Sequence, residues 1–255
     1  MAQNRVRIVD VADSLGLSTA TVSKVIHGKT EKISDETVKR VQLELERSGY
    51  IPNMAGILLA RNQMRISFVV YDGYFEKCSK VVNLVINHYD GGYQAGKYLK
   101  ELGHEKALCI ADNFICMDKE HIEGFCKAFE PGEILRWEIP KTEKERIRFY
   151  DDKYTQLLKG NVTAVFAVSD FYAVELMKFL QGRNIRIPED IQIIGFDDNR
   201  ASRESNPSLT TIHQEAPLRA KTAIKCLEAM RNGTEYETEI VLPVELIKRE
   251  STRKL

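Results

Sequence analysis

Beyond Met64, the chain consists of short apolar runs that alternate with stretches of helical periodicity. The runs cover residues 66–70, 82–86, 107–110, 164–168 and 191–196. Because they are almost continuously apolar, they are typical of strands that are buried on both faces. The remaining stretches predict helices near residues 90–102, 118–130, 143–159, 170–182 and 217–231. This alternation predicts a doubly wound α/β core on a parallel sheet.

The overall charge is balanced, but the two parts of the chain differ slightly. Hydrophobic residues make up 43% and charged residues 29% of the chain, which excludes wholesale disorder. Lys+Arg and Asp+Glu both number 37, so a uniformly basic nucleic-acid coat is excluded. Residues 1–63 hold nine basic and seven acidic side chains, which leaves 28 and 30 for the rest. The first segment is therefore slightly basic, the sign that a DNA-binding head requires.

Cysteine and histidine usage gives little indication of metal or redox chemistry. The five cysteines form no CxxC pair, so we expect reduced, mostly buried thiols. The five histidines are scattered and form no HExxH motif, so we expect neither a metal site nor a cofactor. The longest apolar runs fall short of the roughly 18 residues that span a bilayer. Residues 1–10 lack the apolar core of a signal peptide, so we expect a cytoplasmic protein with no membrane partner.

The first sixty residues predict short helices that are separated by polar turns. Val9, Ala12 and Leu15 give the first helix a short apolar face. Gly16 then suits a left-handed turn, and Ser18 suits the N-cap of a second helix over residues 19–26. We expect the second helix to point its apolar residues inward, namely Val22, Val25 and Ile26.

A third helix is predicted from the cap residue Ser34 to about Ser48, with Val38, Val41 and Leu45 on its buried face. A helix, a glycine turn and a second helix of this size are typical of the helix-turn-helix module, whose second helix enters the DNA major groove. The outward positions of that helix are short or hydrogen-bonding: Thr19, Ala20, Ser23, Lys24 and His27. A small helical bundle of another role is the alternative that geometry leaves open.

The sequence motifs of this head are long and specific enough to indicate a family. Residues 9–12 read VDVA, residues 16–28 read GLSTATVSKVIHG, residues 33–37 read ISDET and residues 48–53 read SGYIPN. These motifs closely resemble the headpiece of LacI/GalR-type bacterial transcriptional repressors. The resemblance implies that Thr19, Ala20 and Lys24 read bases, while Ser18, Thr21, Ser23 and His27 mostly touch phosphates. Lys24 stands where arginine is commoner in the family, and it donates as a point charge without a bidentate fork.

The resemblance continues into a hinge and linker over residues 51–63, which follows Tyr50 and whose helix-forming segment runs from Asn53 to Ala60. In the family this segment becomes helical with its dimer mate on DNA, and a leucine at the position of Leu59 wedges into the minor groove. Gly56 stands where the family usually has alanine, and an interior glycine costs a helix about 1 kcal/mol. We therefore expect a hinge that folds less readily. An ordinary apolar linker is the alternative.

The core at residues 64–255 also resembles this family, which implies a two-lobed, periplasmic-binding-protein-like fold with a small-molecule effector in its cleft. The matching segments are residues 90–96, 121–125, 167–170, 187–198, 207–212 and 242–246. Ser169 and Asp197 would meet at the carboxyl ends of parallel strands, where such folds bind ligands. His121 replaces the arginine that commonly holds an effector, and as a histidine it would change charge near neutral pH.

The core is shorter than the resemblance leads us to expect. The family usually has roughly three further βα units of about 25–30 residues each after the first core strand. We expect a truncated N-lobe at residues 64–86 and 209–236, and a complete C-lobe at residues 87–208 and 237–251. The first strand must then find a new partner or stay as an apolar edge.

Several other features have plain structural interpretations. Asp197 and Asp198 are adjacent on an extended segment and point in opposite directions, so they are not a catalytic pair. Trp137 is interpreted as packing, and residues 141–148 as a solvated helix face. We assign no site to His88, His104 and His213, which are isolated in the sequence.

These patterns predict a sequence-specific DNA-binding regulator, most simply a repressor that binds a pseudo-palindromic operator as a homodimer, and not an enzyme. Its effector would be a sugar or a nucleobase. One alternative is an effector-independent regulator with a degenerate core. A more remote one is a carbohydrate-binding protein or enzyme built on the same core.

Overall fold

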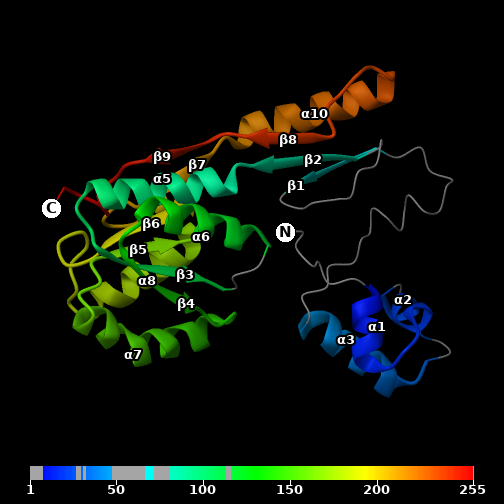
Figure 1. Ribbon diagram of the computed structural model, residues 1–255, viewed down its shortest axis with the longest axis horizontal. Coiled ribbons are helices and arrows are strands. Elements are labelled where there is room, and N and C mark those ends of the chain that lie inside the picture. Colours follow the sequence, from blue (N-terminus) through cyan, green and yellow to red (C-terminus); the bar gives the residue numbers. More distant parts are fainter. Residues whose placement is uncertain are drawn as a thin grey trace. The chain divides into compact units, whose positions relative to one another are not determined.

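The computed structural model describes residues 8–26, 30, 33–47, 67–71, 81–112 and 116–254. The chain forms two compact units, residues 1–66 and 67–255. Figure 1 shows the helical head as one unit and the α/β core as the other. Within the described residues, none of the helices combines the length and the apolar character needed to cross a membrane.

The head contains helices α1 (Ile8–Leu15), α2 (Thr19–Ile26) and α3 (Asp35–Arg47). They enclose a small core of buried side chains: Val11, Ala12, Val22, Val25 and Val41. Of the three residues predicted for the apolar face of α1, Ala12 and Leu15 belong to this core and Val9 does not; Ile8 and Val11 complete the core-facing set. The i, i+3, i+4, i+7 set follows the 3.6-residue helical period better than the i, i+3, i+6 set.

The cap residues behave as their sequence predicts. The Ser18 hydroxyl oxygen accepts a hydrogen bond from the Thr21 backbone N–H at 3.1 Å, and Ser34 accepts one from Thr37 at 3.3 Å. Gly16 has φ +66°, the left-handed conformation expected of a glycine that ends α1. The turn between α1 and α2 is therefore determined locally.

The core is built around a six-stranded sheet in the order β4-β3-β5-β6-β7-β9. The strands are β3 (Lys106–Ala111), β4 (Glu133–Glu138), β5 (Ala164–Ala167), β6 (Gln192–Asp197), β7 (Thr210–Gln214) and β9 (Val244–Ile247). All neighbours are parallel except β7 and β9, which are antiparallel. This arrangement confirms the predicted α/β core on a mostly parallel sheet.

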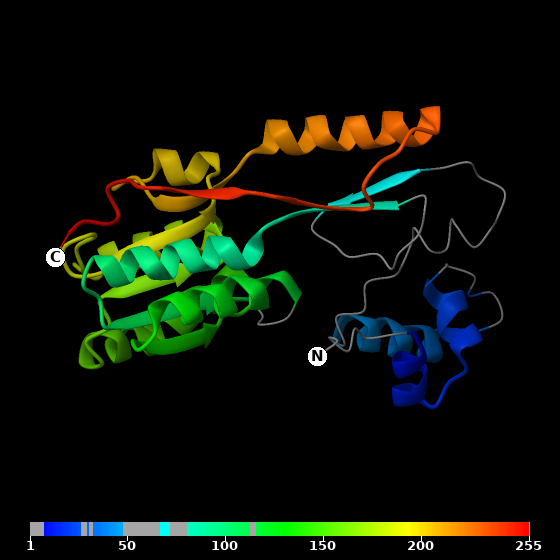
Figure 2. The same cartoon turned by 45° about the horizontal axis from the view of Figure 1, so that its top comes forward.

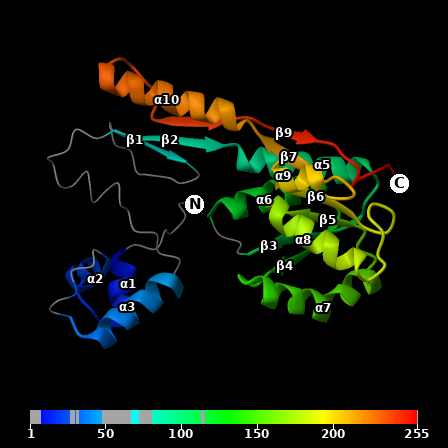
Figure 3. The same cartoon turned by 180° about the vertical axis from the view of Figure 1, so that it is seen from behind.

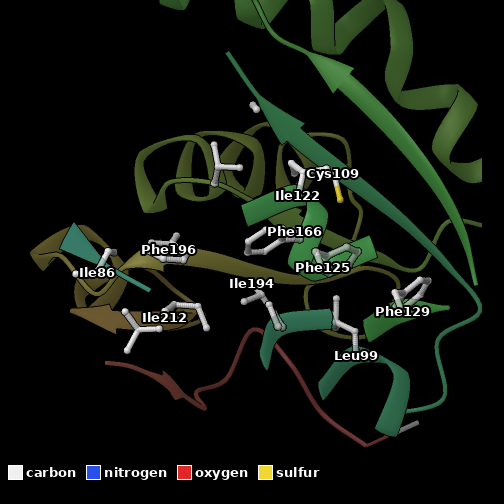
Figure 4. Close-up of a cluster of buried hydrophobic side chains, with 14 of the residues drawn as sticks. Ile86, Leu99, Cys109, Ile122, Phe125, Phe129, Phe166, Ile194, Phe196 and Ile212 are labelled. Carbon is white, nitrogen blue, oxygen red and sulfur yellow. The ribbon is translucent and has the colours of Figure 1, made fainter. Parts of the chain in front are cut away.

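Helices cover both faces of this sheet, so its strands are buried from both sides. One buried cluster joins the sheet to α5 (His88–Glu101) and α6 (Cys116–Phe129), and a second joins it to α7 (Glu143–Lys159) and α8 (Asp170–Gln181). Figure 3 shows α7 and α8 from behind, with the short helix α9 (Arg200–Glu204) above them. In the first cluster, the Phe125 ring stacks on Phe166 at 5.0 Å between centroids (Figure 4).

A second sheet has three parallel strands in the order β1-β2-β8. They are β1 (Phe68–Tyr71), β2 (Val81–Ile86) and β8 (Glu239–Leu242), and α10 (Ala216–Asn232) packs against β1 and β2. Among the strands that the structure describes, β1 pairs with β2 and lies at the edge of this sheet.

The chain crosses between the two sheets at three places (Figure 2). β2 leads to α5 at Asn87, β7 leads to α10 at Glu215, and β8 leads to β9 at Pro243. The lobe boundaries that we expected at residues 209 and 237 were therefore wrong. β7 hydrogen-bonds to β6 in the large sheet, while β8 pairs with β2 in the small one. Strand pairing is a long-range property, so the local sequence does not mark these crossings.

Two side chains in α7 and β4 illustrate how packing differs from local pattern. Trp137 is buried and meets the edge of the Phe149 ring at 5.6 Å, as the packing interpretation predicts. Arg146, which was predicted on a solvated face, is only 3% exposed. It donates two hydrogen bonds of 2.7 Å to the Glu175 carboxylate, and this bidentate pairing compensates for its burial.

Helices α5 and α6 approach so closely that they require glycine. A Cβ atom at Gly92 would lie 1.8 Å from the His121 carbonyl oxygen, and one at Gly124 would lie 2.0 Å from the Tyr89 carbonyl oxygen. Both distances are far shorter than any tolerated contact, so a side chain at either position forces the helix backbones apart.

We expect Gly92→Ala to lower the free energy of unfolding by about 1–3 kcal/mol or more, since the added methyl group overpacks this interface. Gly182→Ala is the matched control, because its Cβ would come no closer than 3.3 Å to other atoms. Urea unfolding, followed by the fluorescence of the single Trp137, measures both. Equal stability of the two variants would contradict the close approach of α5 and α6 at Gly92.

Candidate nucleic-acid interface and ligand site

The N-terminal part of α2 presents small and polar side chains to solvent. Ser18, Thr19, Ala20 and Lys24 are exposed, and Thr21 and Ser23 are half-buried. Val22 and Val25 hold the opposite face in the head core. The helix therefore has one face available for a partner, as the sequence predicts.

Hydrogen bonds at the start of α2 and at the turn before it hold this face in place. The Ser18 and Thr21 hydroxyl groups lie 2.9 Å apart and share a hydrogen bond. On α3, Arg40 donates to the Leu15 carbonyl at 3.2 Å, close to the turn that precedes α2. The remaining predicted DNA contacts lie outside the described residues: His27, Tyr50, Asn53, Gly56 and Leu59.

A second group of polar side chains lies at the carboxyl ends of the parallel strands in the large sheet. Asp197 ends β6, and its Oδ2 accepts a hydrogen bond from the Ser169 hydroxyl at 3.1 Å. Its Oδ1 accepts one from the Gln214 side-chain amide at 2.7 Å. Asp197 has φ 119°, so the backbone enters a region that non-glycine residues rarely adopt. The two residues predicted from the strand ends thus meet.

Two further carboxylates extend this edge. Asp112 follows β3, and Asp118 lies in the first turn of α6. Burial, then the charge and hydrogen bond of Asp112 and the charge of Asp197, together raise the pKa of Asp118 to about 7. We call Asp112, Asp118, Ser169, Asp197 and Gln214 the carboxyl-edge cluster.

His121 has a different environment from the one predicted. Its ring is buried, and its Nε2 lies 2.7 Å from Nδ1 of His88, so the two histidines share a hydrogen bond. The ring also packs on Phe196 at 4.0 Å between centroids. Burial, and then the neighbouring His88, lower the pKa of His121 to about 3. The expected charge change near neutral pH is therefore wrong, and so is the interpretation of His88 as isolated.

Asp198, the neighbour of Asp197, belongs to a separate network. Burial favours its neutral form, but hydrogen bonds from Arg203, Arg249 and His213 outweigh burial and lower its pKa. His213 Nδ1 lies 2.8 Å from its Oδ2, so His213 is also not isolated. The two adjacent aspartates thus point to different partners, as their spacing predicts.

Asp170, the first residue of α8, holds the backbone next to the carboxyl-edge cluster in place. It is fully buried and accepts hydrogen bonds from the Thr211 hydroxyl at 2.5 Å and the Asn199 backbone N–H at 2.9 Å. It thereby ties the turn after β6 to β7. Burial raises its pKa to about 7, although these hydrogen bonds oppose the shift.

The sequence analysis missed Asp112, Asp118 and Gln214. Asp112 was detectable, because it follows the apolar run of β3 as Ser169 and Asp197 follow theirs. Asp118 and Gln214 carry no such signal, since one lies in a helix and the other ends a strand outside the five apolar runs. The described residues hold no cluster of three or more His, Cys, Asp or Glu side chains that could bind a metal ion.

Residues 97–252 match the family model described as "Periplasmic binding protein-like domain", and residues 7–53 match "Bacterial regulatory proteins, lacI family". The chain belongs to the periplasmic binding protein-like family. Its head is of the lacI type, which confirms the resemblance found in the sequence.

Curated relatives agree with this assignment. The HTH-type transcriptional repressor PurR of Vibrio cholerae is 32% identical over 178 residues, which is 68% of this chain and 53% of that protein. The HTH-type transcriptional regulator DegA of Bacillus subtilis is 33% identical over 185 residues, which is 68% of this chain and 52% of that protein. The chain therefore spans about half the length of the curated relatives that it matches.

Solved structures share the fold. A LacI family regulator from Enterococcus faecalis with bound ribose has a TM-score of 0.68 at 23% identity, covering 92% of this chain and 94% of that one. The CelR–cellobiose complex has a TM-score of 0.64 at 20% identity, covering 97% and 100%. The lac repressor dimer bound to operator and the anti-inducer ONPF has a TM-score of 0.58 at 19% identity, covering 97% and 99%.

We expect Asp118→Asn to stabilise the protein at pH 7.5 but much less at pH 5. The folded-state pKa of about 7 lies above the usual 3.8, so this carboxyl destabilises the fold increasingly as pH rises from about 4 to about 7. After allowance for solvent screening, the gain at pH 7.5 is about 1–2 kcal/mol. Urea unfolding at both pH values measures it.

Asp152→Asn, at an exposed position on α7, is the control and should change stability equally at both pH values. A stabilisation by Asp118→Asn that does not grow with pH would contradict the burial of this carboxyl.

Proposed function

We propose that this chain is a sequence-specific DNA-binding transcriptional repressor that acts by binding and not by catalysis. The observation that carries the proposal is the helix-turn-helix head, with its lacI-type match over residues 7–53. Two heads of a homodimer would read the half-sites of a pseudo-palindromic operator. The described curated relatives are transcriptional regulators, which supports this function and a cytoplasmic location.

The exposed face of α2 supports direct base contact. Ala20 offers only a methyl group, which suits contact with a thymine methyl group. Lys24 is exposed and can donate to guanine O6 and N7. Ser18 and Thr21 lie at the N-terminal end of α2, where hydroxyl groups and the helix dipole favour a phosphate.

The carboxyl-edge cluster supports control by a small uncharged ligand rich in hydroxyl or amide hydrogens. Three carboxylates can accept such hydrogens, and Ser169 and Gln214 can donate or accept. The exposed Phe171 ring next to Ser169 can stack on a sugar or nucleobase. An anionic ligand would meet the negative charges of this acidic cluster and be repelled.

An effector-independent regulator is the second candidate, and the burial of His121 favours it. In this chain His121 Nε2 shares a hydrogen bond with His88, and the other ring nitrogen, Nδ1, is buried, so neither nitrogen is exposed to an effector. The small lobe has three strands and one helix in the described residues, which leaves less wall for a cleft. A measurement of ligand binding distinguishes the effector-controlled regulator from the effector-independent one.

We expect Lys24→Ala to weaken binding to a specific operator about tenfold, because a base contact is worth about 1–3 kcal/mol. The operator is first selected from genomic fragments with the full-length protein. Fluorescence anisotropy against this operator and a scrambled duplex then measures the change, with Lys97→Ala on α5 as the control variant.

The loss for Lys24→Ala should be larger on the operator than on the scrambled duplex. An equal loss on both would assign Lys24 to phosphate contact. Absence of a specific complex for the wild-type dimer across all fragments would overturn the proposed function.

For the ligand site, we expect ribose, cellobiose or adenine to raise the melting temperature of the wild-type protein in a saturable way. Asp197→Asn should abolish that shift, because the residue's carboxylate is shared by Ser169 and Gln214 and lies at the centre of the cluster. Asp152→Asn should leave it unchanged. If none of the probes shifts the wild-type protein, the effector-independent alternative holds.

A further inference from the structure

One of the three crossings between the sheets is connected to the carboxyl-edge cluster by side chains. β7 ends at Gln214 and α10 begins at Ala216, so the chain leaves the large sheet at this point. The Gln214 amide nitrogen donates to Asp197 Oδ1 at 2.7 Å, and its amide oxygen accepts from Arg219 Nη1 at 3.2 Å. Gln214 therefore contacts the ligand edge and α10 at once.

Arg219 extends this connection to the small sheet. It is the fourth residue of α10, and its guanidinium carbon is 5.0 Å from the centre of the Tyr71 ring. Tyr71 ends β1, the strand that α10 packs against. A guanidinium over an aromatic ring is attracted by the electrons of the ring face, so the position of Arg219 affects how α10 sits on β1.

The other two crossings are held in a different way. The Asn87 backbone N–H donates to the Leu242 carbonyl at 2.9 Å. Gln94 of α5 binds the backbone of β9 through Val244 and Leu246 at 3.0 Å each. Each of these bonds ends on a backbone atom, whereas the bonds of Gln214 to Asp197 and Arg219 join side chains. The Asn87 bond joins two crossings, and the Gln94 bonds hold α5 to β9 of the large sheet; these printed bonds do not involve Asp197.

We propose that Gln214 and Arg219 couple ligand binding at Asp197 to the packing of α10 on β1. A ligand that donates a hydrogen bond to Asp197 competes with Gln214 for the same carboxylate. Gln214 then turns away, the bond between Gln214 and Arg219 Nη1 is lost, and the guanidinium shifts over Tyr71. This inference rests on the proposed function, because β1 is the first core strand after residues 51–66, which join the core to the head.

The coupling has a distinctive consequence, because Gln214 joins Asp197 to Arg219. Asp197→Asn, which removes the charge at one end, should disturb β1 even though Asp197 is on β6. Arg219→Met, which keeps the length of the side chain but removes the guanidinium, should disturb β1 in the same way. Substitutions at two ends of one chain of contacts are non-additive, whereas independent ones multiply.

Hydrogen–deuterium exchange of the full-length protein tests this without a ligand or DNA. We expect Asp197→Asn and Arg219→Met each to speed amide exchange in the peptide that covers residues 68–71 by about threefold or more. The double variant should exchange no faster than the faster single variant. Asp152→Asn and Lys225→Met, at exposed positions on α7 and α10, should exchange like the wild type.

The Gln214→Leu background separates coupling from general destabilisation. In that background, Asp197→Asn should no longer change exchange in residues 68–71, because the middle contact is gone. In the otherwise wild-type chain, Arg219→Lys keeps a positive charge and a hydrogen-bond donor, so its exchange should lie between that of Arg219→Met and that of the wild type. Multiplicative effects in the double variant, or an undiminished effect of Asp197→Asn in Gln214→Leu, would overturn the coupling.

Operator affinity then tests the regulatory consequence. We expect Arg219→Met to change the operator Kd about fivefold relative to Lys225→Met. An unchanged Kd would overturn the link to regulation even if the exchange data support the coupling. A wild-type protein that binds no operator would instead refute the proposed function, and the exchange data alone would decide the coupling.

Discussion

The site depends on the parallel hydrogen bonding of β4, β3, β5, β6 and β7, because parallel strands all end at the same edge of a sheet. This single constraint brings together Asp112, Ser169, Asp197 and Gln214, which are separated by up to about a hundred residues in the chain. The apolar bodies of the strands are covered by helices on both faces, so the strand ends are the natural place for polar side chains. The candidate ligand-binding side chains therefore lie at the carboxyl ends of the strands, while the bodies of the same strands form the packed core.

The polar groups that are buried near this edge keep their places through specific partners. Asp170 and Asp198 each accept several hydrogen bonds, and both connect the turn after β6 to elements that lie far away in sequence. Burial of a carboxyl is unfavourable unless such partners are present, so these networks define one backbone path through the turn. The positive φ values of Asp197 and Asp198 are held by the same partners. The orientation of Asp197 toward Ser169 and Gln214 follows from this turn.

The sequence predicts most of the fold. Five apolar runs correspond to strands β1, β2, β3, β5 and β6, and the predicted helix ranges agree with the five long core helices within about two residues. Strands β4, β7, β8 and β9 are absent from that set, because they are short, partly polar or at an edge. The candidate site was predicted in part: Ser169 and Asp197 follow apolar runs and meet, whereas His121 faces His88 and Phe196.

The sequence by itself determined what depends on neighbouring residues: the capped helices of the head, the left-handed turn at Gly16, the amphipathic helices and the buried strands. Helical and strand periods are local, so a single sequence displays them. The tertiary structure alone decided which polar groups share a hydrogen bond and where the chain crosses between sheets. His88 and His121 meet because glycines let α5 and α6 approach within backbone contact, and Gln214 joins Asp197 to Arg219 because β7 pairs with β6. Such pairings depend on strand order and helix distance, which no stretch of sequence carries within itself.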